Sequence, residues 1–266
     1  MTDKTKVKEL DLYNQNLGKV PASVWQNPAL EKLNLAENGL DEISEQIGGL
    51  IKLTMLDLGH NHLSFLPESL GKLSALKFLY LSNNSLSAVP PSLWDLKNLV
   101  YLNITDNQFA TLPEDIGWLS SLIELRLYNN QLSSLPHSIG NLTNLRELHV
   151  MGNQLTSLPE SIGKLRNLRK LILEGNKIES LPDSLGDLES LTDLDLRNNK
   201  VKGIPNSIGR LESLRFLDMR ANQLTTLPPG MAGLSKLEKL DLRWNKSLSI
   251  PKWLTRLEER GCTVYT

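Results

Sequence analysis

The chain has 266 residues, of which 22% are charged, and its formal net charge is -1 at pH 7. This balance gives no strong field that would draw the chain to nucleic acid or to an anionic membrane surface. The single cysteine, Cys262, excludes a disulfide framework within the chain, and no apolar stretch is long enough to span a bilayer. With no apolar run of a signal peptide at the N-terminus, these features favour a cytoplasmic protein in a reducing compartment.

One phrase recurs along the chain with a spacing of 23 residues, most clearly at Leu145–Leu168 (LRELHVMGNQLTSLPESIGKLRNL). A period of this size predicts a solenoid. We therefore expect residues 1–266 to form a single domain of eleven repeats without insertions. The first leucine of the L-x-L in each repeat marks the period: Leu10, Leu33, Leu56, Leu79, Leu102, Leu125, Leu148, Leu171, Leu194, Leu217 and Leu240.

The first repeat departs from the pattern. Gln15 stands where later repeats have Asn, and Asn27 stands where they have Leu. A terminal repeat is expected to be atypical, because one of its faces meets water instead of a neighbour. We interpret residues 1–28 as an N-terminal cap, in which the polar segment Met1–Lys6 is expected to fray.

Each later repeat begins with a strand pattern. In the repeat marked by Leu148, the alternation predicts that Leu148 and Val150 point inward and that Glu147, His149 and Met151 point outward. The chain must then turn inside the solenoid, where backbone groups lack a sheet partner. An Asn follows at this point, and its amide can satisfy both a donor and an acceptor. These residues are Asn38, Asn61, Asn84, Asn107, Asn130, Asn153, Asn176, Asn199, Asn222 and Asn245.

The second half of each repeat carries a Leu-Pro pair, which stops the strand. Apolar residues spaced by three then predict a short helix or 3₁₀ turn. A recurring glycine, such as Gly163, is expected to leave room for close packing. Trp94 and Trp118 fall in this half of adjacent repeats. They either cover gaps between the helical turns, which we favour, or form a second contact patch.

The C-terminal residues 251–266 are expected to form a second cap. The pattern of Lys252–Arg260 predicts a helix that Gly261 ends. A last strand follows, with its register shifted by one residue from the 23-residue count. We expect Cys262 and Val264 to face inward, so that Cys262 is a small core residue and not a reactive thiol.

These residues resemble the leucine-rich repeat family, in its 23-residue class with LPxxIGxL in the variable half. The resemblance covers nearly the whole chain. It implies an α/β solenoid, a horseshoe with a parallel sheet on its concave side and short helices or 3₁₀ turns on its convex side. It also implies that ligands bind on the concave face. Within the family, the chain is similar to intracellular Ras-group proteins and bacterial cytosolic proteins, because cysteine caps are missing.

A binding site must come from the outward strand positions, which the repeat leaves free. In repeats three to eight these positions are rich in aromatic, Met and Arg residues, the types enriched at interface anchors. Outward aromatics also pair across strands and favour β structure without any partner. The predicted contact residues of this zone are Met55, Phe78, Tyr80, Tyr101, Arg126, Tyr128, His149, Met151 and Ile172.

In repeats nine to eleven, an outward Asp column (Asp195, Asp218 and Asp241) lies beside an Arg column. The simpler interpretation is a charge-neutral, solvated ladder with little effect on stability. The alternative is a polar docking zone that sets the register of a partner. The predicted contact residues of this second zone are Arg197, Arg220, Arg243 and Trp244.

Other chemistry lacks support in the sequence. His60 and His62 form an H-x-H pair without further ligands at metal spacing, so we expect no metal site. We find no phosphate loop and no nucleophile motif, and therefore expect no cofactor and no catalytic residue. We predict a monomeric, non-enzymatic module that binds a protein or peptide and has a role in intracellular signalling. The alternatives are a bacterial effector or surface protein that binds a host protein, and a regulatory partner of a GTPase or kinase.

Overall fold

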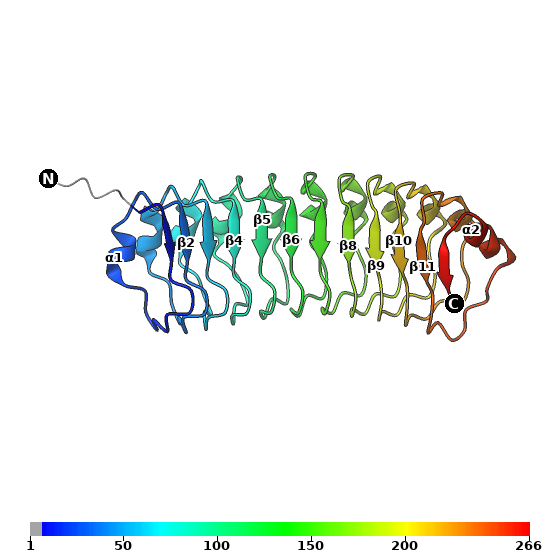
Figure 1. The fold of residues 1–266 in the computed structure, drawn as a ribbon, viewed down its shortest axis with the longest axis horizontal. Helices are drawn as coiled ribbons and strands as arrows, with labels where there is room; N and C mark the ends of the chain where they lie inside the picture. Colours follow the sequence, from blue (N-terminus) through cyan, green and yellow to red (C-terminus); the bar gives the residue numbers. More distant parts are fainter. Residues whose placement is uncertain (1–6) are drawn as a thin grey trace. The chain divides into compact units, whose positions relative to one another are not determined.

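The structure is a computed structural model that describes residues 7–266. The expected fraying of Met1–Lys6 lies outside the described residues. The chain divides into two compact units. In each unit, the strands follow one another in chain order (Figure 1). Unit 1 contains the described residues up to Ala110 and the segment Trp118–Arg126, and unit 2 contains Thr111–Gly117 and Leu127–Thr266.

Unit 1 is built from short parallel strands that follow one another in chain order. Each marker leucine pairs with the marker of the next repeat, as in Leu33 with Leu56. The elements are β1 (Glu9–Asp11), α1 (Ala22–Trp25), β2 (Lys32–Asn34), η1 (Glu45–Gly49), β3 (Met55–Asp57), η2 (Glu68–Lys72), β4 (Phe78–Tyr80), η3 (Pro91–Asp95), β5 (Tyr101–Asn103) and β6 (Glu124–Arg126), where η denotes a 3₁₀ helix. The 3₁₀ helix η4 (Glu114–Trp118) contains one boundary between the units.

Unit 2 repeats the same arrangement of strands and 3₁₀ helices. The elements are β7 (Glu147–His149), β8 (Lys170–Ile172), β9 (Asp193–Asp195), β10 (Phe216–Asp218), β11 (Lys239–Asp241), β12 (Thr263–Tyr265), η5 (His137–Asn141), η6 (Glu160–Lys164), η7 (Asp183–Asp187), η8 (Asn206–Arg210), η9 (Pro229–Gly233), η10 (Lys252–Leu254) and α2 (Thr255–Glu259). The predicted α/β solenoid, with a parallel sheet and 3₁₀ turns, is confirmed. In residues 7–266, no helix has the length and apolarity needed to cross a membrane.

The core of each unit consists of stacked leucine layers. In the repeat marked by Leu148, both Leu148 and Val150 are fully buried, whereas Glu147, His149 and Met151 are partly exposed. The predicted inward and outward positions are therefore confirmed. This burial of apolar surface is the main contribution to the stability of the fold.

The repeated Asn side chains bridge consecutive coils, as predicted. Asn153 Oδ1 accepts the backbone N–H of Leu132 at 3.0 Å, and its Nδ2 donates to the carbonyls of Leu127 and Val150 at 3.0 and 3.1 Å. Asn153 is buried. Its removal leaves several buried backbone groups unpaired, at a cost of about 1–3 kcal/mol.

The residue before each of the repeated Asn residues, from Asn38 to Asn245, adopts left-handed backbone geometry. Its φ is 52° in Asn83 and 65° in Gly152, for example. Asn, Asp, His and Gly adopt this geometry most readily, and most repeats place one of them here. Glu37, Ala221 and Trp244 are exceptions, with φ of 56°, 52° and 65°.

The repeated glycine in the 3₁₀ helices permits close packing between coils. A Cβ atom on Gly163 would lie 2.5 Å from the backbone oxygen of Ser184 in the next coil. The prediction of a glycine for close approach is therefore confirmed. Trp94 is buried at 2% exposure, so it packs inside unit 1, but Trp118 is 50% exposed. The interpretation as a gap-covering residue fits the buried Trp94, and a contact patch that includes the Trp94 ring is excluded. For Trp118, both interpretations stay predictions.

The C-terminal cap has the predicted elements. η10 and α2 cover Lys252–Glu259, and Gly261 adopts φ of 91° after them. Strand β12 pairs Val264 with Leu240, which confirms the register shift of one residue. Cys262 is buried, and burial raises the pKa of its thiol, so the thiolate that would react is disfavoured.

Candidate functional site

The outward strand positions form what we call the sheet face of each unit. Most predicted contact residues on this face are only partly exposed, because neighbouring side chains cover them. They therefore lie at outward positions, as predicted, and their role as contact residues stays a prediction. Phe78 and Trp244 are more fully exposed, at 39% and 65%.

On unit 1, the predicted residues form what we call the aromatic face. The rings of Tyr80 and Tyr101 lie 4.9 Å apart at an interplanar angle of 38°. The Arg126 guanidinium lies 5.7 Å from the Tyr101 ring centre, and its Nε donates to Glu124 at 2.6 Å. Two tilted rings in contact, with an adjacent cation, supply large contact area at a low entropic cost. The aromatic face consists of Met55, Phe78, Tyr80, Tyr101 and Arg126.

Asp57 lies beside the aromatic face, where its strand β3 pairs Asp57 with Tyr80. Its Oδ1 accepts the backbone N–H of Gly59 at 2.9 Å. Burial raises the pKa of Asp57, and the Gly59 N–H and His60 only partly offset this effect. Burial also raises the pKa of Tyr80, and the charge of Asp57 adds to that shift. A partly buried carboxylate therefore faces an aromatic ring.

On unit 2, the predicted residues Tyr128, His149, Met151 and Ile172 occupy outward positions and are partly exposed. Glu147 accepts from His149 Nε2 at 3.1 Å and from Lys170 Nζ at 3.1 Å. Burial acts to raise the pKa of Glu147, but the bonds to His149 and Lys170 outweigh it and lower that pKa. His149 thus belongs to an ion-pair network and is not an isolated side chain.

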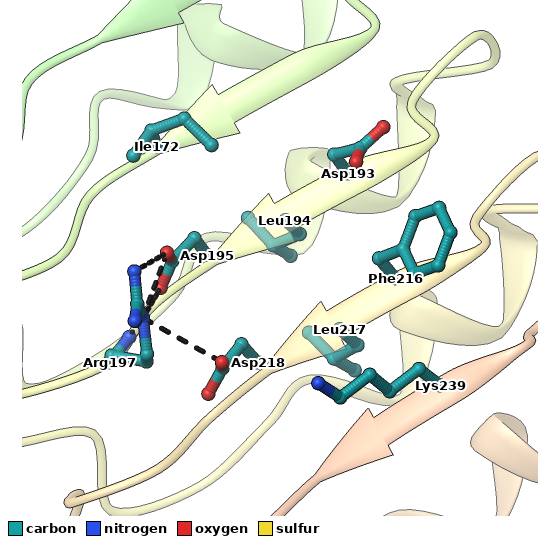
Figure 2. A pocket seen from close by; sticks show the side chains of 9 residues that line it. All are labelled: Ile172, Asp193, Leu194, Asp195, Arg197, Phe216, Leu217, Asp218 and Lys239. Carbon is teal, nitrogen blue, oxygen red and sulfur yellow. Dashed lines mark hydrogen bonds and ion pairs between the residues drawn. The ribbon is translucent and has the colours of Figure 1, made fainter. Parts of the chain in front are cut away.

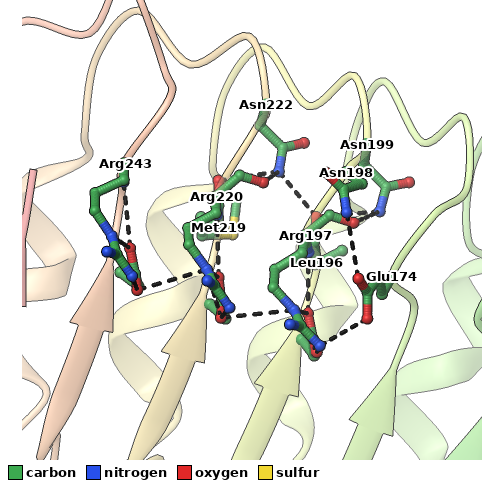
Figure 3. Close-up of polar contacts among 12 residues, drawn as sticks. Glu174, Leu196, Arg197, Asn198, Asn199, Met219, Arg220, Asn222 and Arg243 are labelled. Atoms are coloured by element: carbon green, nitrogen blue, oxygen red, sulfur yellow. Dashed lines mark hydrogen bonds and ion pairs between the residues drawn. The ribbon is translucent and has the colours of Figure 1, made fainter.

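The arginine–aspartate ladder of unit 2 is confirmed (Figure 3). Arg197 donates from Nη2 to Asp195 at 2.7 Å and to Glu174 at 2.6 Å, and its Nε lies 3.6 Å from Asp218. The same pairing recurs in the next two repeats. The carboxylates are largely covered, and the side chain of Asp241 is fully buried. The expectation of exposed pairs is therefore wrong for Asp241, and the effect of this pair on stability stays a prediction. The ladder consists of Asp195, Arg197, Asp218, Arg220, Asp241 and Arg243.

Trp244 ends the ladder with an exposed ring. The guanidinium groups of Arg220 and Arg243 lie 5.9 and 5.7 Å from its ring centre. Left-handed backbone is unusual for a bulky side chain and costs of order 1–2 kcal/mol. An exposed Trp in strained geometry is consistent with its predicted role as a contact residue.

A hollow of about 280 Å³ lies on the sheet face of unit 2 (Figure 2). Leu194 and Leu217 lie between its polar and aromatic borders. Phe216, at 36% exposure, borders it and was not among the predicted contact residues, although its outward slot is visible in the sequence. The lining consists of Ile172, Asp193, Leu194, Asp195, Arg197, Phe216, Leu217, Asp218 and Lys239.

The two histidines of the H-x-H pair take different partners. His60 Nδ1 lies 2.9 Å from Asn83 Nδ2, and His62 Nδ1 lies 3.8 Å from Asp41 Oδ1. The two rings therefore have different polar partners, Asn83 for His60 and Asp41 for His62.

Comparison with protein families matches three leucine-rich repeat descriptions. "Leucine rich repeat" matches residues 5–63 and 52–109, "Leucine-rich repeat region" matches 91–171 and 114–202, and "Leucine Rich Repeat" matches 213–234. The chain belongs to the leucine-rich repeat family. The matches do not distinguish the LPxxIGxL class within it. A comparison with curated proteins found no match.

Several solved leucine-rich repeat structures are similar to this chain. The plant peptide hormone receptor RGFR1 in complex with RGF2 is 32% identical over 92% of this chain and 41% of its own, with a TM-score of 0.81. The ectodomain of the receptor kinase GASSHO1/SCHENGEN3 from Arabidopsis thaliana is 29% identical over 90% of this chain and 36% of its own, with a TM-score of 0.63. The functional domain of InlJ from Listeria monocytogenes is 24% identical over 91% of this chain and 52% of its own, with a TM-score of 0.76. This likeness shows the shared fold alone. The chain spans less than half the length of the two plant receptors.

Proposed function

We propose that this leucine-rich repeat protein is a non-enzymatic recognition module whose sheet face binds a protein or an extended peptide. One observation carries the proposal. The outward positions of β3–β6 hold Met55, Phe78 and the contacting pair of Tyr80 and Tyr101, although the repeat needs only its inward leucines there. Such side chains are enriched where proteins bind one another.

The similar structures support a peptide as one class of partner. RGFR1 is bound to RGF2, and GASSHO1/SCHENGEN3 is bound to CASPARIAN STRIP INTEGRITY FACTOR 2. On unit 2, the hollow beside Phe216 is large enough to take one side chain of an extended chain. The ladder arginines and Trp244 are proposed to contact the same partner as the hollow.

The proposal also includes the oligomeric state of the protein and its location in the cell. We propose a single-domain monomer in the cytoplasm, since the chain carries one cysteine and that residue is buried. A role in intracellular signalling belongs to the same proposal. Fractionation of the native cells tests the location, and a protein recovered from the medium with intact cells contradicts it. Light scattering of the purified protein tests the monomer.

The recognition function is tested with a random peptide library displayed on phage and selected on the full chain. The variant Tyr80→Ala/Tyr101→Ala/Tyr128→Ala removes three aromatic rings from the sheet face and should lose the peptides that the wild type retains. Phe65→Ala is the matched control, because Phe65 is 57% exposed but lies outside the strands. Equal retention of peptides by the triple variant and the wild type contradicts the proposal.

A further inference from the structure

The outward strand position that Asp57 occupies recurs in every repeat. In the arginine–aspartate ladder, this position shows which cation an aspartate can bind there. In the ladder, Asp195 Oδ1 accepts the backbone N–H of Arg197 at 3.0 Å, and the same Arg197 side chain then donates from Nε and Nη2 to the carboxylate at 2.9 and 2.7 Å. Asp57 Oδ1 accepts the N–H of Gly59 at 2.9 Å in the same way. The backbone arrangement is therefore shared, and only the guanidinium is missing in repeat three.

The carboxylate of Asp57 has no internal cation to replace that guanidinium. Among residues 7–266, no Lys or Arg forms an ion pair with Asp57. Within this described part of the chain, no Lys or Arg forms an ion pair with Asp11, two strands away, and the charge of Asp11 adds to the raised pKa of Asp57. A partly buried carboxylate without a cation is costly to the fold, and it favours a cation from outside.

A second feature of unit 1 shows how a cation would lie here. Arg126 places its guanidinium 5.7 Å from the centre of the Tyr101 ring. Tyr80, whose ring contacts that of Tyr101, is the register partner of Asp57 on the adjacent strand. A guanidinium on Asp57 would therefore stand beside the Tyr80 ring, much as Arg126 stands beside Tyr101. The planar guanidinium suits both contacts, because it binds a carboxylate with two donors and stacks on a ring.

We propose that Asp57 and Tyr80 form a subsite for an arginine side chain of the bound polypeptide. The inference rests on the proposed function, which it deepens by naming the chemistry of one partner residue and the strand positions, on β3 and β4, that receive it. Lysine is a poorer occupant, since a single ammonium group cannot reproduce the paired donors that Arg197, Arg220 and Arg243 present to their aspartates.

Two substitutions test the subsite in opposite ways. Asp57→Asn removes the charge but keeps the local fold, because Asn34 and Asn103 occupy the same strand position in β2 and β5 and accept the N–H of Ala36 and Thr105 at 3.0 Å. Gly59→Arg instead supplies an internal guanidinium, as in the ladder, and should occupy the subsite. A Cβ atom on Gly59 would lie 3.1 Å from Asp57 Oδ1, so the neighbours must shift by a few tenths of an ångström.

The experiment uses the displayed random peptide library described above, followed by titration of one enriched peptide as a synthetic probe. We expect the enriched peptides to share an arginine. Asp57→Asn should weaken the probe about tenfold or more, as expected when one member of a partly covered charge pair is removed. Gly59→Arg should weaken it likewise. Asp95→Asn, which removes an exposed carboxylate at the end of η3, is the matched control and should leave the affinity unchanged.

A probe with citrulline in place of arginine completes a double-mutant cycle, because citrulline keeps the shape and loses the charge. The citrulline probe should bind weakly to the wild type and should lose nothing further on Asp57→Asn. The inference is overturned if the peptides lack arginine, or if Asp57→Asn binds within twofold of the wild type. In that case, continued loss of binding in Tyr80→Ala/Tyr101→Ala/Tyr128→Ala leaves the proposed function standing. If the peptides bind independently of those three rings, both proposals fail.

Discussion

The carboxylate of Asp241 is fully buried beneath the side chain of Arg243, which donates to its two oxygens from Nε at 2.9 Å and from Nη2 at 2.6 Å. The Nε of Arg220 lies 3.5 Å from the same carboxylate. A buried carboxylate depends on such partners, because its own desolvation is unfavourable. Burial acts to raise the pKa of Asp241, and the two arginines outweigh it, so that the pKa is lowered.

Removal of the guanidinium should therefore destabilise unit 2. We expect Arg243→Met, which keeps the apolar stem, to lower the free energy of unfolding by about 1–3 kcal/mol, since Arg220 still covers part of the charge. Arg215→Met is the control, because its pair with Glu238 is half exposed and should contribute less than about 1 kcal/mol. Urea unfolding measures both variants, and equal losses contradict this account.

The substitution of Asp by Asn should have opposite effects on stability at Asp57 and at Asp241, which occupy the same strand position in different repeats. The pKa of Asp241 is lowered, so its charged form stabilises the fold above its unfolded pKa of about 3.9, and this contribution is lost as the pH falls. The pKa of Asp57 is raised, so its charged form destabilises the fold, and stability falls as the pH rises through its folded pKa. At pH 7, Asp241→Asn should destabilise the protein and Asp57→Asn should stabilise it.

The pH dependence of these two variants checks the cause. Both differences from the wild type should shrink when urea unfolding is repeated at progressively lower pH. The effect of Asp57→Asn disappears below the raised pKa of Asp57, and the effect of Asp241→Asn declines as the pH falls from its unfolded pKa of about 3.9 through its lowered folded pKa. A difference that persists unchanged at low pH points to packing and not to charge.

The substitution of Gly by Ala should destabilise the protein where the glycine packs closely against the next coil, and should not do so where the glycine faces open space. In Gly163→Ala, the new methyl meets the backbone oxygen of Ser184, and we expect a loss of about 1–3 kcal/mol. In Gly203→Ala, nothing lies within 4 Å of the new methyl, and we expect a gain of about 0.4–1 kcal/mol from the unfolded chain. Thermal unfolding measures both, and a stable Gly163→Ala variant contradicts the packing argument.

The substitution of Ala by Gly should have opposite effects on stability at Ala221, which has left-handed backbone geometry, and at Ala232, which does not. Ala221 has φ of 52°, so Ala221→Gly relieves strain of about 1–2 kcal/mol and loses about 0.5–1 kcal/mol in chain entropy. The net effect should be stabilising. Ala232 lies in η9 without such strain, and Ala232→Gly should destabilise the protein by about 0.5–1 kcal/mol. Melting temperatures that fall in both variants contradict the strain at Ala221.

The sequence by itself determined the fold, because the 23-residue period places the same residue types in the same environment in each repeat. Leu148 and Val150 were predicted inward from alternation, Asn153 at the turn from its donor and acceptor, and Gly163 at a close approach, and the structure shows each of them in place. The same periodicity predicted the ladder of Asp and Arg columns, and even the register shift at β12.

The tertiary structure alone decided how strongly each outward residue is covered. Asp57 and Asp241 occupy the same strand position, and the residue two places later, Gly59 or Arg243, already shows which of them has a nearby cation. Only the structure shows that Asp241 is fully buried beneath Arg243, whereas Asp57 is partly exposed. The reason is physical. A repeat fixes the direction of a side chain, whereas its burial and charge depend on side chains of the neighbouring coils, 23 residues away, which differ from repeat to repeat.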